Sequence, residues 1–345
     1  MDKSKNISYE VIRIVAMLMV IMVHVSSFIF WEPNITPRTF MYLNIIDSMS
    51  RIGVGLFIML SGALLLDENR KSDRHTMMKR IKRILIVLFS WSLFYATYYK
   101  IYSPLKYSGT IVLKDFFELF IFGYYHMWYL YMLIGLYLVT PILRAFVKTE
   151  NKDIVLWFII LAMFFEGVVP TFNQLFHIEI LKRLSDSLMM NFVTGFVLYY
   201  VLGWYVTHIR INGKQRKILY LLGAAGLLFT ITATYIITDP KTVVNETFYR
   251  NTGINIILYA LGTFVFLNHT FRNIENKTAV KFITVLSSLS LGVYMIHAFI
   301  VEKVHVLHLS KRIVFLLPAN FLLTAVISIA IVYIISKIPL LRKTI

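Results

Sequence analysis

Long apolar segments recur along the whole chain, and they constrain the fold more than any other feature of the sequence. A helix needs ~20 mostly apolar residues to cross a bilayer, and most of these segments come close to that length. They lie near residues 7–30, 49–66, 83–102, 127–147, 154–170, 190–208, 217–237, 252–269, 283–302 and 313–337. The sequence therefore predicts an all-α, polytopic membrane helix bundle of about ten transmembrane helices, in a single integral membrane domain over residues 1–345.

The composition excludes several other classes of protein. Of the 345 residues, 58% are hydrophobic and only 15% are charged, whereas a soluble domain carries roughly 25% charged residues. Ten spans and their loops use the whole length, so we expect no sizeable soluble domain and no nucleic-acid-binding domain. The chain has no cysteine, which excludes a thiol nucleophile and thiolate ligands to a metal.

The excess of positive charge predicts how the chain is oriented. The net charge is +17, and cytoplasmic loops of membrane proteins are enriched in Lys and Arg. With the N-terminus inside, 22 of the 35 Lys and Arg residues fall in inner segments and 12 in outer ones. We therefore expect both termini in the cytoplasm. The long outer loop 103–126 contains an amphipathic stretch, which predicts an interfacial or re-entrant helix.

Ionisable residues within the first span are candidate functional residues, because each costs several kcal/mol in lipid unless it is paired or hydrated. Glu10 and Arg13 are three residues apart, so they share a helix face and can form an ion pair. His24 follows Arg13 by eleven residues, or roughly 16 Å along the helix, in the outer half of the span. An ion pair at the start of the helix and a hydrogen-bonded structural histidine are the alternative interpretations.

Two arginines at the predicted cytoplasmic start of the third span form a second candidate site. Arg80 and Arg83 face one way, and guanidinium groups bind phosphate through paired hydrogen bonds. A phosphorylated substrate could be held there. The simpler interpretation is that they anchor the helix at the cytoplasmic headgroups.

Two further histidines are predicted at the depth of His24. His126 opens the fourth span beside Trp128 and Tyr129, and His297 follows Tyr294 in the ninth span. A shared cavity could join the three histidines. We expect no metal site, because no two histidines have ligand spacing on one helix. The small residues in the stretch 53–62 predict close packing of the second helix.

Together these residues resemble acyltransferase family 3, the polytopic membrane acyltransferases of bacterial surface polysaccharides and related acceptors. Glu10 stands where many members have an aspartate. The matching motifs, which extend over nearly the whole chain, are Arg13-x10-His24, the stretch 53–62 ending in Ser-Gly, Arg80-x-x-Arg83, the stretch 126–141 beginning His-Met-Trp-Tyr, and Ser290-x-x-x-Tyr294-x-x-His297.

The resemblance implies an integral O-acyltransferase, with acetyl as the expected group, in a bacterial cell membrane. Acyl-CoA, expected to be acetyl-CoA, would be a co-substrate, with no bound cofactor. The acceptor would be a hydroxyl of an extracytoplasmic molecule such as a cell-surface glycan. Arg80 and Arg83 would bind the donor's phosphates. His24 would act as general base or accept the acyl group, with Arg13 and Glu10 in support. The acceptor-side residues would be His126, Trp128, Tyr129, Tyr294 and His297.

Many members of this family carry an additional extracytoplasmic domain, whereas this chain resembles the stand-alone type. The final transfer would then occur here or on a separate acceptor-side transferase. Two other classes stay open at this point: a transporter or flippase of a lipid-linked sugar or small anion, and a non-catalytic membrane scaffold. The sequence leaves the acceptor, the acyl chain and the oligomeric state open.

Overall fold

The computed structural model describes residues 6–30, 35–70, 74–107, 113–188, 195–239, 244–310 and 312–345. Throughout these residues the chain is helical with connecting loops and has no strand, as predicted. The α-helices are α1 (Ile7–Phe30), α2 (Pro37–Ser50), α3 (Gly53–Leu65), α4 (Arg74–Tyr107), α5 (Leu113–Phe122), α6 (Trp128–Phe146), α7 (Lys152–Ala162), α8 (Val169–Phe176), α9 (Glu179–Ser187), α10 (Val197–His208), α11 (Gly213–Ile237), α12 (Ile254–Thr270), α13 (Lys277–Ser288), α14 (Ser290–His305) and α15 (Ile313–Lys337).

Among the described residues, fewer helices qualify as membrane spans than the ten that the sequence predicts. Eight helical stretches of the described residues are long and apolar enough to cross a membrane, and α13 with α14 makes a ninth if this bent pair is one span. The predicted span 190–208 is not among them. Its described helix, α10, has 12 residues, and residues 189–194 lie outside the described part of the chain. The count of ten is therefore not confirmed.

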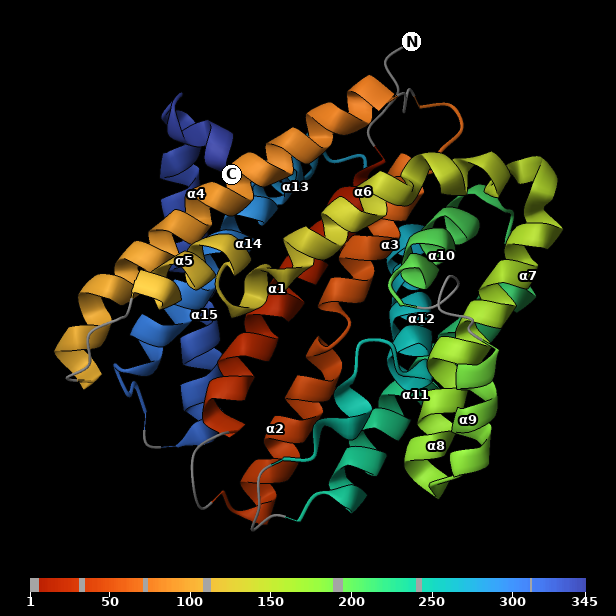
Figure 1. Ribbon diagram of the computed structural model, residues 1–345, viewed down its shortest axis with the longest axis horizontal. Coiled ribbons are helices and arrows are strands. Elements are labelled where there is room, and N and C mark those ends of the chain that lie inside the picture. The colour runs from red at the N-terminus through yellow and green to blue at the C-terminus, as the bar shows by residue number, and fades with distance from the viewer. Residues whose placement is uncertain are drawn as a thin grey trace.

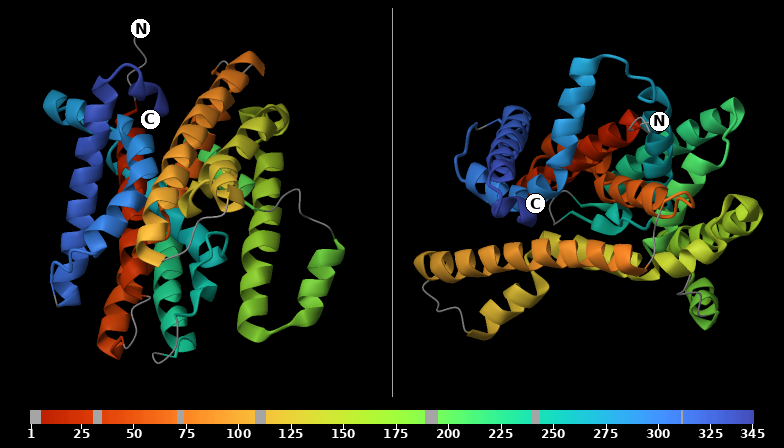
Figure 2. Two further views of the ribbon diagram at one scale, coloured as in Figure 1. Left: turned by 60° about the vertical axis from the view of Figure 1, so that its left-hand side comes forward. Right: turned by 90° about the horizontal axis from the view of Figure 1, so that it is seen from above.

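Helix α1 is the central element of the bundle (Figure 1). It contacts α2 and α3 and all four helices from α12 to α15. Ile12, Ala16 and Val20 follow one another at a spacing of four, which places them on one helix face, and all three are buried. Figure 2 shows α4 along one side of the bundle and the antiparallel pair α8–α9 at its edge. Residues on α1 can consequently contact residues from both the N-terminal and the C-terminal half of the chain.

Helices α3 and α10 pack with their backbones in contact. A Cβ atom on Gly62 would lie 1.7 Å from the carbonyl oxygen of Tyr200, and one on Gly203 would lie 1.8 Å from that of Met59. Real atoms do not approach so closely, so only glycine fits at either position. The prediction that small residues of the second span serve close packing is confirmed.

Helix α2 extends the second span beyond its predicted start. Its Asp47 is fully buried and accepts hydrogen bonds of 2.6 Å from the Ser26 hydroxyl and from Nε of Arg51. The Arg51 guanidinium lies 4.3 Å from the centroid of the Tyr249 ring. These polar side chains form hydrogen bonds and ion pairs with one another inside the bundle. A helix with a polar sequence can therefore lie in the protein interior.

The predicted interfacial helix in the loop 103–126 is present as α5, a separate helix of ten residues. Its position relative to a membrane stays a prediction. Helix α4 runs further than the predicted span 83–102, from Arg74 to Tyr107.

The basic segments of the chain gather at one end of the bundle. The Ser8 hydroxyl, at the start of α1, donates a hydrogen bond of 2.7 Å to Asn268 near the end of α12. His208, at the end of α10, lies 3.6 Å from the carboxylate of Asp67, just after α3. The basic segments at this end are 67–70, 74–83, 210–217 and 272–281. That this end faces the cytoplasm stays a prediction from its charge.

Candidate functional site

Glu10, Arg13 and Ser287 form a polar group where α1 meets α13. Nη1 of Arg13 lies 2.6 Å from the Glu10 carboxylate and donates to the Ser287 hydroxyl oxygen at 3.0 Å. The Ser287 hydroxyl in turn donates to the same carboxylate. The predicted Glu10–Arg13 ion pair is confirmed. Ser287 was not predicted, because no spacing rule connects it to residues almost 280 positions earlier.

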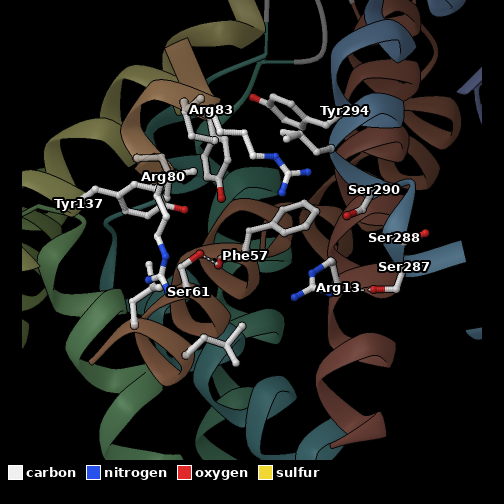
Figure 3. A pocket seen from close by; sticks show the side chains of 16 residues that line it. Arg13, Phe57, Ser61, Arg80, Arg83, Tyr137, Ser287, Ser288, Ser290 and Tyr294 are labelled. Carbon is white, nitrogen blue, oxygen red and sulfur yellow. Dashed lines mark hydrogen bonds between the residues drawn. The ribbon is translucent and has the colours of Figure 1, made fainter. Parts of the chain in front are cut away.

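A cavity of about 500 Å³ lies beside this group, between α1, α3, α4, α6 and the α13–α14 bend. We call it the arginine pocket, because the guanidinium groups of Arg13, Arg80 and Arg83 are arranged around it (Figure 3). None of the residues lining it is acidic. The remaining lining residues are Phe57, Ser61, Leu64, Leu65, Ile84, Tyr129, Leu133, Tyr137, Ser287, Ser288, Ser290, Leu291 and Tyr294.

The two arginines from α4 have spare hydrogen-bonding capacity. Nη1 of Arg80 is buried and has no hydrogen-bond partner in the described part of the chain. Arg83 is exposed and makes one long contact, 3.4 Å from its Nη2 to the main-chain oxygen of Ile345. Since a buried unpaired guanidinium N–H costs free energy, an anion in the pocket would relieve that cost. The arrangement is suited to binding a polyanion such as a chain of phosphates.

The three histidines predicted at one depth lie together. His24 comes from α1, His126 from the short helix η1 (Tyr125–Met127) and His297 from α14. The ring centroids of His24 and His297 are 5.0 Å apart, and those of His126 and His297 are 5.2 Å apart. The structure therefore brings these residues into one histidine cluster, and any role in chemistry remains a proposal.

Main-chain hydrogen bonds set the protonation of two of these rings. Nδ1 of His297 lies 2.6 Å from the Tyr294 carbonyl, and Nε2 of His126 lies 3.2 Å from the Met295 carbonyl. A carbonyl can only accept, so each of these nitrogens carries the proton. The opposite nitrogens, Nε2 of His297 and Nδ1 of His126, are buried without a partner among the described residues.

His24 differs from the other two histidines. It is only partly buried, and its side chain has no hydrogen bond to any described residue. The edge of the Tyr125 ring packs against it at 5.2 Å between centroids. No group of histidine, aspartate and glutamate among the described residues has the arrangement to hold a metal ion. His126 and His297 are each held by a main-chain hydrogen bond, whereas the His24 imidazole has none within the described part of the chain.

Tyr294 connects the arginine pocket with the histidine cluster, and Tyr129 packs against it. Both line the pocket, and their rings lie 5.3 Å apart. The Tyr294 ring is also 5.6 Å from His126 and 5.6 Å from His297, and its hydroxyl donates to the main-chain oxygen of His126. The structure places both tyrosines in the lining of the arginine pocket, and the acceptor-side role that the sequence assigned to them stays a prediction.

Trp128 is not part of the cluster. Its side chain is 40% exposed, and its ring packs against Phe196 with 5.4 Å between centroids. The neighbouring Tyr129 points inward because successive helical residues differ by about 100° in direction. A role for Trp128 at the site therefore has no geometric support.

A second polar chain borders the histidine cluster. The Tyr124 hydroxyl donates to the Glu302 carboxylate and lies 2.8 Å from the Tyr99 hydroxyl. Tyr124 also packs against Tyr125, with 4.6 Å between ring centroids. Glu302 stands at the end of the predicted span 283–302, and no spacing rule connects it to Tyr124. The sequence feature that could have indicated this polar chain is the pair Tyr124 and Tyr125 directly before His126.

Comparison with known proteins identifies the family of the chain. Residues 6–337 match the acyltransferase domain that defines acyltransferase family 3. The chain belongs to this family. The match extends over nearly all of the predicted bundle, so the chain is a multi-pass membrane acyltransferase rather than a transporter or a scaffold. No match was found among curated proteins or among solved structures.

Proposed function

We propose that this family member is an O-acyltransferase that uses acyl-CoA at its basic end and a hydroxyl acceptor on the opposite, extracytoplasmic side. Acetyl-CoA is the donor we propose, and a cell-surface glycan is the acceptor class. The observation that carries the proposal is the arrangement of two sites in series. A cationic pocket bordered by Arg13, Arg80 and Arg83 has Tyr294 in its lining, and the other neighbours of the Tyr294 ring include His126 and His297 of the histidine cluster.

The donor would bind with its phosphates in the arginine pocket. Coenzyme A carries phosphate groups at one end and a thioester at the other, so one molecule presents both a polyanion and a reactive carbonyl. Bidentate guanidinium–phosphate bonds would hold the first part. The apolar lining residues Phe57, Leu133 and Leu291 suit the slender arm that leads to the thioester.

His24 would perform the chemistry. As general base, its free nitrogen takes the proton of the acceptor hydroxyl while the oxygen attacks the thioester carbonyl and the thiolate leaves. In the covalent alternative, the same nitrogen attacks first and carries the acyl group to the acceptor. Arg13, held by Glu10 and Ser287, would bind the donor. His126 and His297 would surround the reacting groups.

The test uses the protein in liposomes with radiolabelled acetyl-CoA supplied at the basic end. We expect slow release of coenzyme A by the wild-type protein, and at least roughly 100-fold slower release by His24→Ala, because general-base catalysis contributes about 10²–10⁴ in rate. Label retained on the protein would support the covalent route. His75→Ala is the matched control, because His75 is an exposed histidine outside the pocket.

Unchanged release from folded His24→Ala protein would contradict the assignment of His24. Absence of both binding and release in the wild type, again with folded protein, would contradict acetyl-CoA as donor. The same assay with succinyl-CoA and longer acyl-CoA then tests the acyl-CoA class as a whole.

A further inference from the structure

A second cationic cavity lies at the same end of the bundle and shares no residue with the arginine pocket. We call it the second cationic pocket. It has a volume of about 310 Å³ and lies between the end of α10, the start of α11 and the end of α12. Its basic residues are Arg210, Arg216, Arg272, His208 and His269. They come from three segments of the chain, so the fold itself brings the charges together.

The positive charge of this pocket is not compensated. None of the lining residues is acidic, and Arg210, Arg216 and Arg272 form no ion pair within the described part of the chain. The carboxylate that contacts a residue of this pocket is that of Asp67. It lies 3.6 Å from His208 and also 3.6 Å from Arg70, so two basic groups already share it. Three uncompensated guanidinium groups around one cavity repel one another, and an anion between them would remove that repulsion.

Neutral groups add to the preference for an anion. Asn268 lines the pocket, and its side-chain oxygen accepts the Ser8 hydroxyl, which leaves the amide N–H groups to donate. Arg216 lies in the first turn of α11, whose N-terminus is capped by Asn212 and Gln215. The donors that this pocket offers to phosphate oxygens are therefore the arginine guanidinium groups and the Asn268 amide.

We propose that the second cationic pocket is a phosphate-binding site, separate from the site for the acyl donor. Its ligand is a phosphate ester, either the headgroup of an anionic phospholipid or a soluble phosphorylated molecule. Basic pockets between helices at the cytoplasmic side of membrane proteins are known to bind anionic headgroups. Positive charges that serve orientation alone need not converge on a cavity, whereas here three arginines do.

The test compares two double variants of the full-length protein in nanodiscs. Arg216→Gln/Arg272→Gln removes two charges from the pocket. Lys214→Gln/Lys217→Gln removes two exposed charges from the same first turn of α11, outside the pocket. Bound phosphatidylglycerol is counted by native mass spectrometry in phosphatidylcholine nanodiscs that contain a stated fraction of it. A second arm titrates inorganic phosphate and glycerol 3-phosphate in phosphatidylcholine alone, where the anionic lipid is absent.

We expect the arginine variant to weaken binding by roughly tenfold or more, because bonds to charged groups are lost. The lysine variant should stay within about twofold of the wild type, as expected for exposed charges. Phosphatidylglycerol bound to the wild type assigns the site to a lipid headgroup, and phosphate or glycerol 3-phosphate bound in the arm without anionic lipid assigns it to a soluble phosphate.

Two results would overturn the proposal: no binding in either arm, or equal losses in the two double variants, which would indicate surface charge only. Arg80→Gln/Arg83→Gln should retain binding, and its loss there would place the ligand in the arginine pocket instead. Arg210→Gln provides a third probe if the arginine double variant does not fold. Because the readout is binding without acyl-CoA, failure here would leave the proposed acyltransferase reaction untouched.

Discussion

Arg80 and Arg83 differ from the two lysines beside them, Lys79 and Lys82, because the arginines line a cavity and the lysines do not. We predict that Arg80→Gln/Arg83→Gln raises the KM for acyl-CoA at least roughly tenfold, since each lost bond to a charged group contributes ~1.5–3 kcal/mol. Initial rates at varied acyl-CoA concentrations measure this change.

The matched control is Lys79→Gln/Lys82→Gln, which removes the same charge from the same turn of α4. If both double variants raise the KM equally, the arginines act through general charge and the proposed phosphate contact is wrong. If neither raises it, the donor does not bind in the arginine pocket.

The group formed by Glu10, Arg13 and Ser287 predicts a graded loss of stability. Ser287→Ala removes two hydrogen bonds but leaves the ion pair, so we expect a loss of about 1–2 kcal/mol in unfolding free energy. Arg13→Ala should cost more, about 3 kcal/mol, because it leaves the partly buried carboxylate without its partner. Thermal unfolding in detergent measures the order. A larger loss for Ser287→Ala than for Arg13→Ala would contradict this account.

At the level of single residues, spacing rules predicted a side-chain contact only where both residues lie in one helix. The Glu10–Arg13 pair followed from a separation of three residues, and the shared depth of the three histidines followed from their positions along predicted spans. Ser287 and Glu302 could not be found in this way. Their partners lie far away in the sequence, and only the packing of α1 against α13, and of η1 against α14, brings them together.

The contact between α3 and α10 is the element-scale feature most sensitive to substitution. Gly203→Ala would place a methyl group against the backbone of α3, so the helices must separate. We expect a loss of about 1–3 kcal/mol or more, the usual cost of overpacking. Gly135→Ala is the matched control, because a Cβ there meets nothing within 4 Å. It should be neutral or stabilising by ~0.5–1 kcal/mol, and thermal unfolding compares the two.

Equal melting temperatures for Gly203→Ala and Gly135→Ala would show that α10 can move away from α3 without cost. The assignment of this contact as a fixed part of the scaffold would then be wrong.

Element boundaries were predicted best where a span is uniformly apolar. The predicted spans 7–30 and 313–337 coincide with α1 and α15. The start of the second span was missed by about twelve residues, because α2 contains Asp47 and Asn44, which hydropathy counts against a buried helix. Both are fully buried and are partnered by residues from other helices. The bend of 59° between α13 and α14 also escaped prediction, since no proline or glycine marks it.

For the whole molecule, the gathering of basic segments at one end predicts its orientation. The chain has no cysteine, so single cysteines can be introduced without changing others. Asn273→Cys lies at the basic end and Asn245→Cys beyond the far end of α11. Because positive loops are retained in the cytoplasm, a membrane-impermeant maleimide added to intact cells should label Asn245→Cys and spare Asn273→Cys.

Labelling after cell lysis provides the control, since both cysteines should then react. The reverse pattern in intact cells would place the arginine pocket outside. The proposed use of cytoplasmic acyl-CoA would then be wrong, whatever the activity of the purified protein.

The contact between Tyr129 and Tyr294 has a consequence for the energy metabolism of the cell. A protein that passes an acyl group through the bilayer must not also pass protons or ions, because the gradients across that membrane drive other work. The two rings lie 5.3 Å apart between the arginine pocket and the histidine cluster. On the proposed function, the acyl group would have to pass these rings, and its own bulk would have to fill the space that they leave. Otherwise each turnover would open a path for ions through the membrane.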